Sequence, residues 1–345
     1  MKTIKNILLT TFQNKEWWNY YGGIFDCDIF TSKDCKSFIE EFFEKSGKTN
    51  LLRYLESQAT SLESERWQHI VYTFLLGIYI YKKSSYRTSI DNEIRKLFKK
   101  GLESEIKFEF VWFLICLFHD LSYNVENNLS NDIFLDFKKY KLRTVSGVPS
   151  LFKGLPIRYY YYRRMQGKND HGVFAGLTMF KQLYEIRKKQ KDNYDKCHTD
   201  KEKILCWEKP LEKIYNYAAW VVACHNMWFK HSNETSEALE CTLYRLFGLD
   251  NLILNDDGRM YKHECRKYPI FFLFCIIDTI EVIKVTCGIE ELGKISLEIL
   301  EDGDAILIDI SEARDQKRLM ANIKSLDKWI TDVTVESNYR LKIKL

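Results

Sequence analysis

The sequence predicts a mainly α-helical protein with a small α+β segment at its C-terminal end. Hydrophobic residues make up 46% of the 345 residues, and only four prolines and few glycines interrupt the chain, which favours helices over a loop-rich β fold. Alternation with the two-residue period of half-buried strands begins only beyond Thr286. We therefore expect an N-terminal helical cover over residues 1–59, a helical domain over 60–286 and an α+β segment over 287–345.

The N-terminal part has helical spacing from Ser37 to Lys45 but no residues that suggest chemistry. Its first apolar stretch is too short for a signal peptide, and the longest apolar runs, near Phe110 and Ile270, fall short of the roughly 20 residues that a membrane span needs. The ten cysteines form no short-spaced framework, which is typical of reduced thiols. We expect a cytoplasmic protein that does not contact a membrane.

A long helix is predicted from Thr60 to Lys83, because its apolar residues share one helical face and Thr60 and Glu63 have the spacing of a capping box. His69 lies inside this helix, beside the apolar face. Taken alone, such a histidine is more often a core residue bonded to a main-chain carbonyl than a ligand.

The stretch FVWFLICLFHD places two polar residues at the end of an apolar helix. Phe110 to Phe118 is apolar on every face and leads directly into His119 and Asp120. Burying an imidazole and a carboxylate together is costly unless a partner compensates both, and a divalent metal ion is such a partner. The alternative is a histidine at the helix C-terminus beside an N-cap aspartate.

Similar polar residues recur on three later helices. His171 falls in a first helical turn behind the N-cap Asp170, and His225 lies near the end of the apolar helix 211–230. Asp278 is embedded in the helix that Pro269 opens, with Glu281 three residues on and hence on the same face. An unpaired buried carboxylate is costly, so Asp278 requires either an arginine or a metal ion.

The segment RYYYYRRMQGK, residues 158–168, is basic and aromatic together. A solvated face with snorkelling side chains and a phosphate-binding site both explain this composition. Its place directly before His171 favours the phosphate role. Tyr159–Tyr162 offer rings on which a base can stack, and the cations that would neutralise phosphate oxygens are Arg158, Arg163, Arg164 and Lys168.

In chain order, the unusual polar residues are a histidine, a His-Asp doublet, two further histidines and a distant aspartate. This order resembles the HD-domain superfamily of metal-dependent phosphohydrolases over roughly residues 60–283, and the extra histidines resemble the subset that holds two metals. The pieces that carry the resemblance are RWQHIVYTFLLG, FHDLSY, NDHGVFAG and CHN. Many relatives have a lysine three residues after the doublet aspartate, where this chain has Tyr123, so a step assigned to that lysine is not carried over.

The resemblance implies an HD-type helical bundle and one or two divalent ions of iron, manganese, zinc, cobalt or nickel. The ligands of one ion would be His69, His119, Asp120 and Asp278, with Asp120 as a bridge, and His171 and His225 would complete a second site. The metal would activate a water for attack on phosphorus, and Asp120 or Glu126 would take the proton.

The expected function is therefore hydrolysis of a phosphoester bond in a nucleotide or a related small phosphorylated substrate. A nuclease is compatible but less favoured, because the net charge is only +4 and no long basic stripe marks a nucleic-acid surface. Two other classes stay open: a di-iron oxygenase, which the resemblance also includes, and a non-catalytic sensor or binding module that retains the fold. The sequence does not indicate an oligomeric state.

Overall fold

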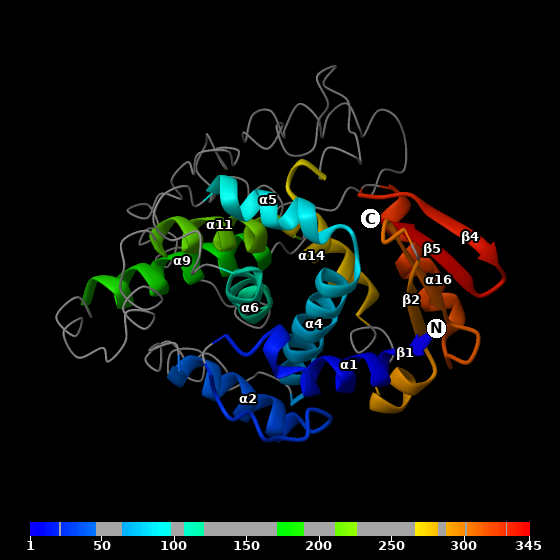
Figure 1. The fold of residues 1–345 in the computed structure, drawn as a ribbon, viewed down its shortest axis with the longest axis horizontal. Coiled ribbons are helices and arrows are strands. Elements are labelled where there is room, and N and C mark those ends of the chain that lie inside the picture. Colours follow the sequence, from blue (N-terminus) through cyan, green and yellow to red (C-terminus); the bar gives the residue numbers. More distant parts are fainter. Residues whose placement is uncertain are drawn as a thin grey trace, which may run out of the picture.

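The computed structural model describes residues 1–20, 22–45, 64–97, 107–120, 171–189, 211–225, 266–281, 288–300, 302–328 and 330–345. Helices dominate these residues, and a small antiparallel sheet lies at one end of the helical part (Figure 1). The prediction of a mainly helical protein with a small C-terminal appendage is thus confirmed.

The described helices surround α4, which runs through the middle of the helical part (Figure 1). Helices α1, α2, α5, α6 and α14 all contact it, and α9 and α11 pack beside α6. The helices are α1 (Ile4–Gln13), α2 (Ser32–Lys45), α4 (Ser64–Lys83), α5 (Arg87–Leu97), α6 (Phe108–Phe118), α9 (His171–Lys189), α11 (Leu211–Cys224), α14 (Pro269–Ile280) and α16 (Gln316–Ser325), with short 3-10 turns η1 (Lys15–Trp17), η5 (Ile289–Gly293) and η6 (Leu326–Lys328).

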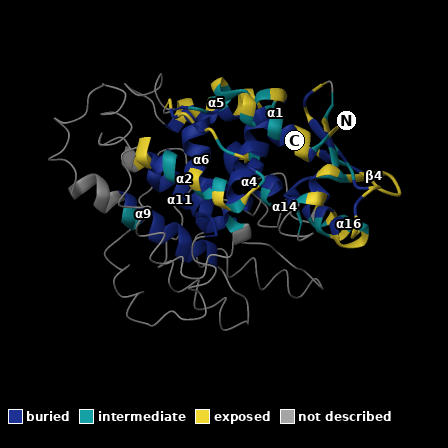
Figure 2. Ribbon diagram, turned by 90° about the horizontal axis from the view of Figure 1, so that it is seen from below, coloured by how far each residue is buried: buried dark blue, intermediate teal, exposed yellow. Residues whose placement is uncertain are grey.

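Helix α6 is the most buried element, since all of its 11 residues are buried. Its Trp112 packs against Gly77 of α4, where any Cβ would overlap the indole ring, and the indole N–H donates to the carbonyl of Phe74 at 3.1 Å. Figure 2 shows α4, α6 and α11 largely in the dark blue of buried residues. The all-apolar sequence of α6 therefore reflects contact with neighbours on every side.

Helices α9 and α11 approach each other closely because two glycines line their contact. A Cβ on Gly172 would lie 2.7 Å from the carbonyl oxygen of Val222, and a Cβ on Gly176 would overlap the carbonyl oxygen of Ala219. Glycine removes both clashes and lets the backbones meet. This contact fixes the start of α9 beside the end of α11.

The sheet has the strand order β1-β2-β3-β5-β4, with antiparallel neighbours throughout. The alternating stretches after Thr286 form β2 (Ser296–Ile299) and β3 (Ala305–Asp309), and the last stretch forms the hairpin β4 (Val333–Ser337) and β5 (Arg340–Lys344). A strand that the sequence analysis did not predict, β1 (Lys2–Thr3), pairs with β2 and joins the N-terminus to this sheet.

The described helices include none whose length and apolar character would suffice to cross a membrane. Five cysteines lie among the described residues, and all five are free thiols: Cys27, Cys35, Cys116, Cys224 and Cys275.

Candidate metal centre

Histidine and carboxylate side chains from five helices, or from the residues that directly follow them, meet in one buried region. Five of these six side chains lie at or near helix ends, and one lies inside α4. The residues are His69 in α4, His119 and Asp120 after α6, His171 at the start of α9, His225 after α11 and Asp278 near the end of α14. The structure thus brings together all six side chains that the sequence analysis proposed as metal ligands.

The first cluster is centred on two imidazole nitrogens. Nε2 of His69 and Nε2 of His119 lie 2.9 Å apart. Oδ2 of Asp120 lies 3.6 and 3.5 Å from these two nitrogens, and Oδ1 of Asp278 lies 3.5 and 3.4 Å from them. Four donor atoms therefore surround a single small volume.

The other ring nitrogens show which tautomer each histidine adopts. Nδ1 of His119 lies 2.7 Å from the carbonyl oxygen of Cys116, and Nδ1 of His69 lies 2.6 Å from Oε2 of Glu281. A carbonyl or carboxylate oxygen accepts, so both Nδ1 atoms carry the hydrogen and both Nε2 atoms have lone pairs. These lone pairs face each other and two carboxylate oxygens, an arrangement that is compatible with a cation between them.

A second cluster shares Asp120 with the first. Oδ1 of Asp120 lies 3.2 Å from Nε2 of His171, and one ligand atom each of Asp120, His171 and His225 lie within 4.8 Å of one another. Nδ1 of His225 donates to the carbonyl oxygen of Val222 at 2.6 Å, which again leaves Nε2 as the lone-pair nitrogen. Because Asp120 directs one oxygen to each cluster, the two clusters share its carboxylate.

Burial surrounds the centre with protein and favours the neutral form of His225. His119 is 0% exposed, and the ring of Phe274 packs against both His119 and His225, with centroid separations of 5.2 and 5.7 Å. Burial lowers the pKa of His225 from 6.5 to about 3, and the charge of nearby His171 acts in the same direction. A neutral imidazole is the form that binds a metal ion. Both clusters could therefore hold a metal ion.

Two contacts that were not predicted hold Asp120 and His69 in place: Arg66 contacts Asp120, and Glu281 contacts His69. Nη1 of Arg66 donates to the main-chain carbonyl of Asp120 at 3.1 Å, from one helical turn before His69. Glu281 was expected on the same helical face as Asp278, but α14 ends at Ile280 and Glu281 has an extended backbone, with φ −65° and ψ 122°. The spacing Asp-x-x-Glu at the end of an apolar helix was the available signal.

Asp278 is less buried than the sequence suggested, because its side chain is 10% exposed. The remaining candidates lie outside the described residues: the proposed proton acceptor Glu126, the position of Tyr123, the ring segment Tyr159–Tyr162 and the proposed phosphate-binding cations Arg158, Arg163, Arg164 and Lys168. Their roles stay predictions.

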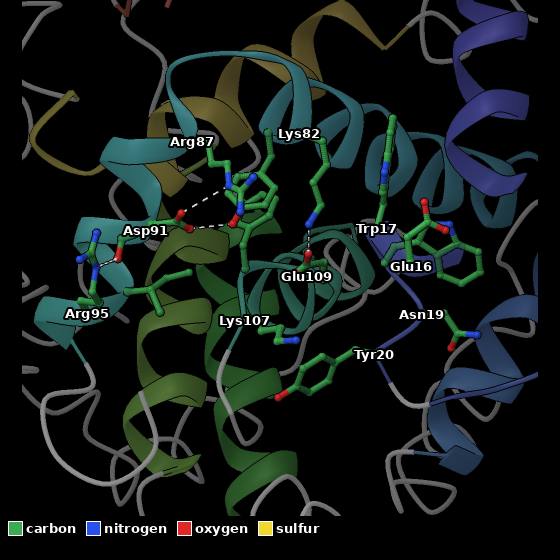
Figure 3. Close-up of a pocket in the computed structure, with 14 residues that line it drawn as sticks. Glu16, Trp17, Asn19, Tyr20, Lys82, Arg87, Asp91, Arg95, Lys107 and Glu109 are labelled. Atoms are coloured by element: carbon green, nitrogen blue, oxygen red, sulfur yellow. Dashed lines mark hydrogen bonds and ion pairs between the residues drawn. The ribbon is translucent and has the colours of Figure 1, made fainter. Parts of the chain in front are cut away.

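A separate cleft of about 460 Å³ lies at the ends of α4 and α6 that are farther from the His-Asp clusters (Figure 3). Its central charges are paired, since Nζ of Lys82 lies 2.6 Å from Oε1 of Glu109 and Nε of Arg87 lies 3.5 Å from Oδ2 of Asp91. Carboxylates that are neutralised in this way do not call for an additional cation. The His-Asp clusters are therefore the stronger candidate for a functional site.

No protein-family model matches this chain, and no curated protein or solved structure matches it either. Membership of the HD-domain superfamily accordingly stays a prediction.

Proposed function

We propose that this protein is a metal-dependent hydrolase of phosphoester bonds, with a nucleotide or a related small phosphorylated molecule as its substrate. The observation that carries the proposal is the convergence of the two Nε2 lone pairs of His69 and His119 on oxygens of Asp120 and Asp278. A buried group of imidazole nitrogens and carboxylate oxygens at these distances is compatible with a bound cation.

The donor set indicates the class of metal. Both clusters offer imidazole nitrogens and carboxylate oxygens, and among the described residues neither includes a thiolate. Such a set suits iron, manganese, zinc, cobalt or nickel and argues against a structural zinc site. When bound, a pair of such ions would supply a nucleophilic water near neutral pH and neutralise oxygens on phosphorus.

The residues of the chain have separate tasks in this proposal. Asp120, which the two clusters share, would keep them in position relative to each other and accept a proton from the attacking water. The packing of Phe274 would exclude bulk water, which strengthens every charge interaction in the centre. Glu126 is the second candidate for the proton, and the basic segment 158–168 would hold the phosphate.

The first experiment measures metal content and activity together. Protein purified without an affinity metal column is analysed for bound transition metals and incubated with a panel of nucleotides, and the products are separated by chromatography. The double variant His119→Ala plus Asp120→Ala should lose the metal and all product formation. The control variant Asp309→Asn, whose carboxylate pairs with Arg340 in the sheet, should keep both.

Each outcome has a clear meaning. Product formation that persists in the double variant would come from a contaminant and would refute the assignment. Oxygen consumption without phosphate release would replace hydrolysis by di-iron oxygenase chemistry. A protein that binds nucleotides and metal but turns over none of the panel would support a sensor module instead.

A further inference from the structure

We infer that Glu281 is a positioning residue that makes the metal centre asymmetric, so that the cluster around His69 and His119 binds its ion more tightly than the cluster around His171 and His225. This inference rests on the proposed metal centre and adds a rank order to it. It comes from the partners of the histidine nitrogens that face away from the centre.

The contact between Glu281 and His69 is short and buried. Oε2 of Glu281 lies 2.6 Å from Nδ1 of His69, and Glu281 is only 2% exposed. The hydroxyl oxygen of Thr73 lies 3.5 Å from the same nitrogen. The main-chain N–H of Glu281 donates to the carbonyl of Ile277 at 2.9 Å, which anchors its backbone to the end of α14. The carboxylate is therefore held in position on the imidazole.

The equivalent contacts of His119 and His225 are of another kind. Each Nδ1 donates to the main-chain carbonyl three residues earlier, that of Cys116 at 2.7 Å and that of Val222 at 2.6 Å. A carbonyl fixes the tautomer and the ring orientation but carries no net charge. A carboxylate does both and also makes the ring a stronger donor at its other nitrogen. Among these three histidines, His69 is the strongest expected ligand.

The charges around the two clusters point in the same direction. Among the described residues, the first cluster has Oδ2 of Asp120, Oδ1 of Asp278 and, through His69, the carboxylate of Glu281. Among the described residues, the second cluster has the other oxygen of Asp120 in direct contact, and Asp278 acts on His225 through its charge without a contact as close. A cation in the first cluster therefore experiences the more negative potential at close range and in a buried setting.

The test uses the substitution Glu281→Gln and a matched control, Glu93→Gln. Both residues are buried glutamates that contact the ends of α14, because Oε2 of Glu93 accepts from the N–H of Ile270 at 2.9 Å. The two ends lie about 16 Å apart along the helix, from a rise of about 1.5 Å per residue. The control thus repeats the chemical change on α5, at the other end of α14 and away from the metal centre.

Apo-protein is titrated with Mn²⁺ and with Co²⁺ by calorimetry, with chelator competition for tight binding. The wild type should show a tight and a weak binding event. Glu281→Gln should weaken the tight event by about 10-fold to 100-fold and leave the weak event nearly unchanged. Glu93→Gln should leave both unchanged. Circular dichroism of each apo-protein checks the fold. If Glu281→Gln is unfolded, Glu281→Asp takes its place. This variant keeps the carboxylate but has a shorter reach, so the tight binding event should weaken by less than the loss of about 10-fold to 100-fold expected for Glu281→Gln.

The outcomes separate this inference from the proposal beneath it. If the wild type binds neither ion, the metal centre itself is refuted. If the wild type binds two ions and the Glu281 variants weaken neither event, or both equally, the asymmetry is refuted while the metal centre stands. Loss confined to the weak event would show that the rank order is reversed.

Discussion

Replacement of Glu93 by glutamine should change how the stability of the protein depends on pH. The carboxyl group of Glu93 is buried at the N-terminal end of α14, where it accepts a hydrogen bond from the N–H of Ile270 at 2.9 Å. Burial raises its pKa from 4.5 to about 7, although the bond from Ile270 and the neighbouring hydroxyl of Tyr217 offset part of this rise. The folded protein therefore prefers the neutral acid.

The sign of the effect follows from the raised pKa. Because the folded state binds the proton more tightly than the unfolded state, the contribution to stability is complete below a pH of about 4.5 and is lost as the pH rises through about 7. One pKa unit corresponds to about 1.4 kcal/mol, so the loss between pH 4 and pH 8 is about 3 kcal/mol. Glutamine keeps the oxygen acceptor, is uncharged at every pH and avoids this loss.

The measurement is urea unfolding of metal-free wild type and Glu93→Gln across this pH range, so that metal binding does not contribute. Between pH 4 and pH 8, the free energy of unfolding of the variant should rise by about 3 kcal/mol relative to that of the wild type. This gain should appear as a higher urea midpoint, with an unchanged dependence of the free energy on urea concentration. Two curves that stay parallel over the whole range would refute the reasoning, because they would show that Glu93 titrates alike in both states.

Two further changes probe the packing. Gly176→Ala places a methyl group against the carbonyl oxygen of Ala219 and should cost about 1–3 kcal/mol and reduce bound metal, as seen by thermal unfolding and metal analysis. Gly288→Ala, with nothing within 4 Å, is its control, and equal losses in both would contradict the close contact of α9 and α11. Lys82→Met should lower the free energy of unfolding by roughly 3 kcal/mol, because it leaves Glu109 buried without its cation. Adding Glu109→Gln to this variant should recover most of the lost stability, and a failure to recover it would argue against the ion pair.

Much of the site was predictable because its residues contrast with their surroundings. A histidine or aspartate on an otherwise apolar helix is rare, and this local contrast marked the positions of His119, His225 and Asp278 without any knowledge of the fold. Helix α6 was predictable from its uninterrupted apolar run, and strands β2 and β3 from their alternation with a period of two.

Other features depend on contacts that no local pattern announces. Strand β1 has only two residues, and its pairing with β2 joins residues nearly 300 positions apart, as Lys2 opposite Leu297. Helix α2 begins at Ser32, ahead of the predicted start at Ser37, because the hydroxyl of Thr31 accepts from the N–H of Asp34 and extends the helix by a turn. Such signals are short, and periodicity alone does not resolve them.

Glu281 shows most clearly why the helical period was insufficient. A continuous helix would direct Asp278 and Glu281 to one side, whereas the two nitrogens of His69 point in different directions. In the structure, Oδ1 of Asp278 lies 3.5 Å from Nε2 and Oε2 of Glu281 lies 2.6 Å from Nδ1. One imidazole can contact both carboxylates because α14 ends between them, at Ile280. The end of this helix is therefore part of the candidate metal centre, and a change that extended α14 by a turn would disturb His69 without replacing any proposed ligand.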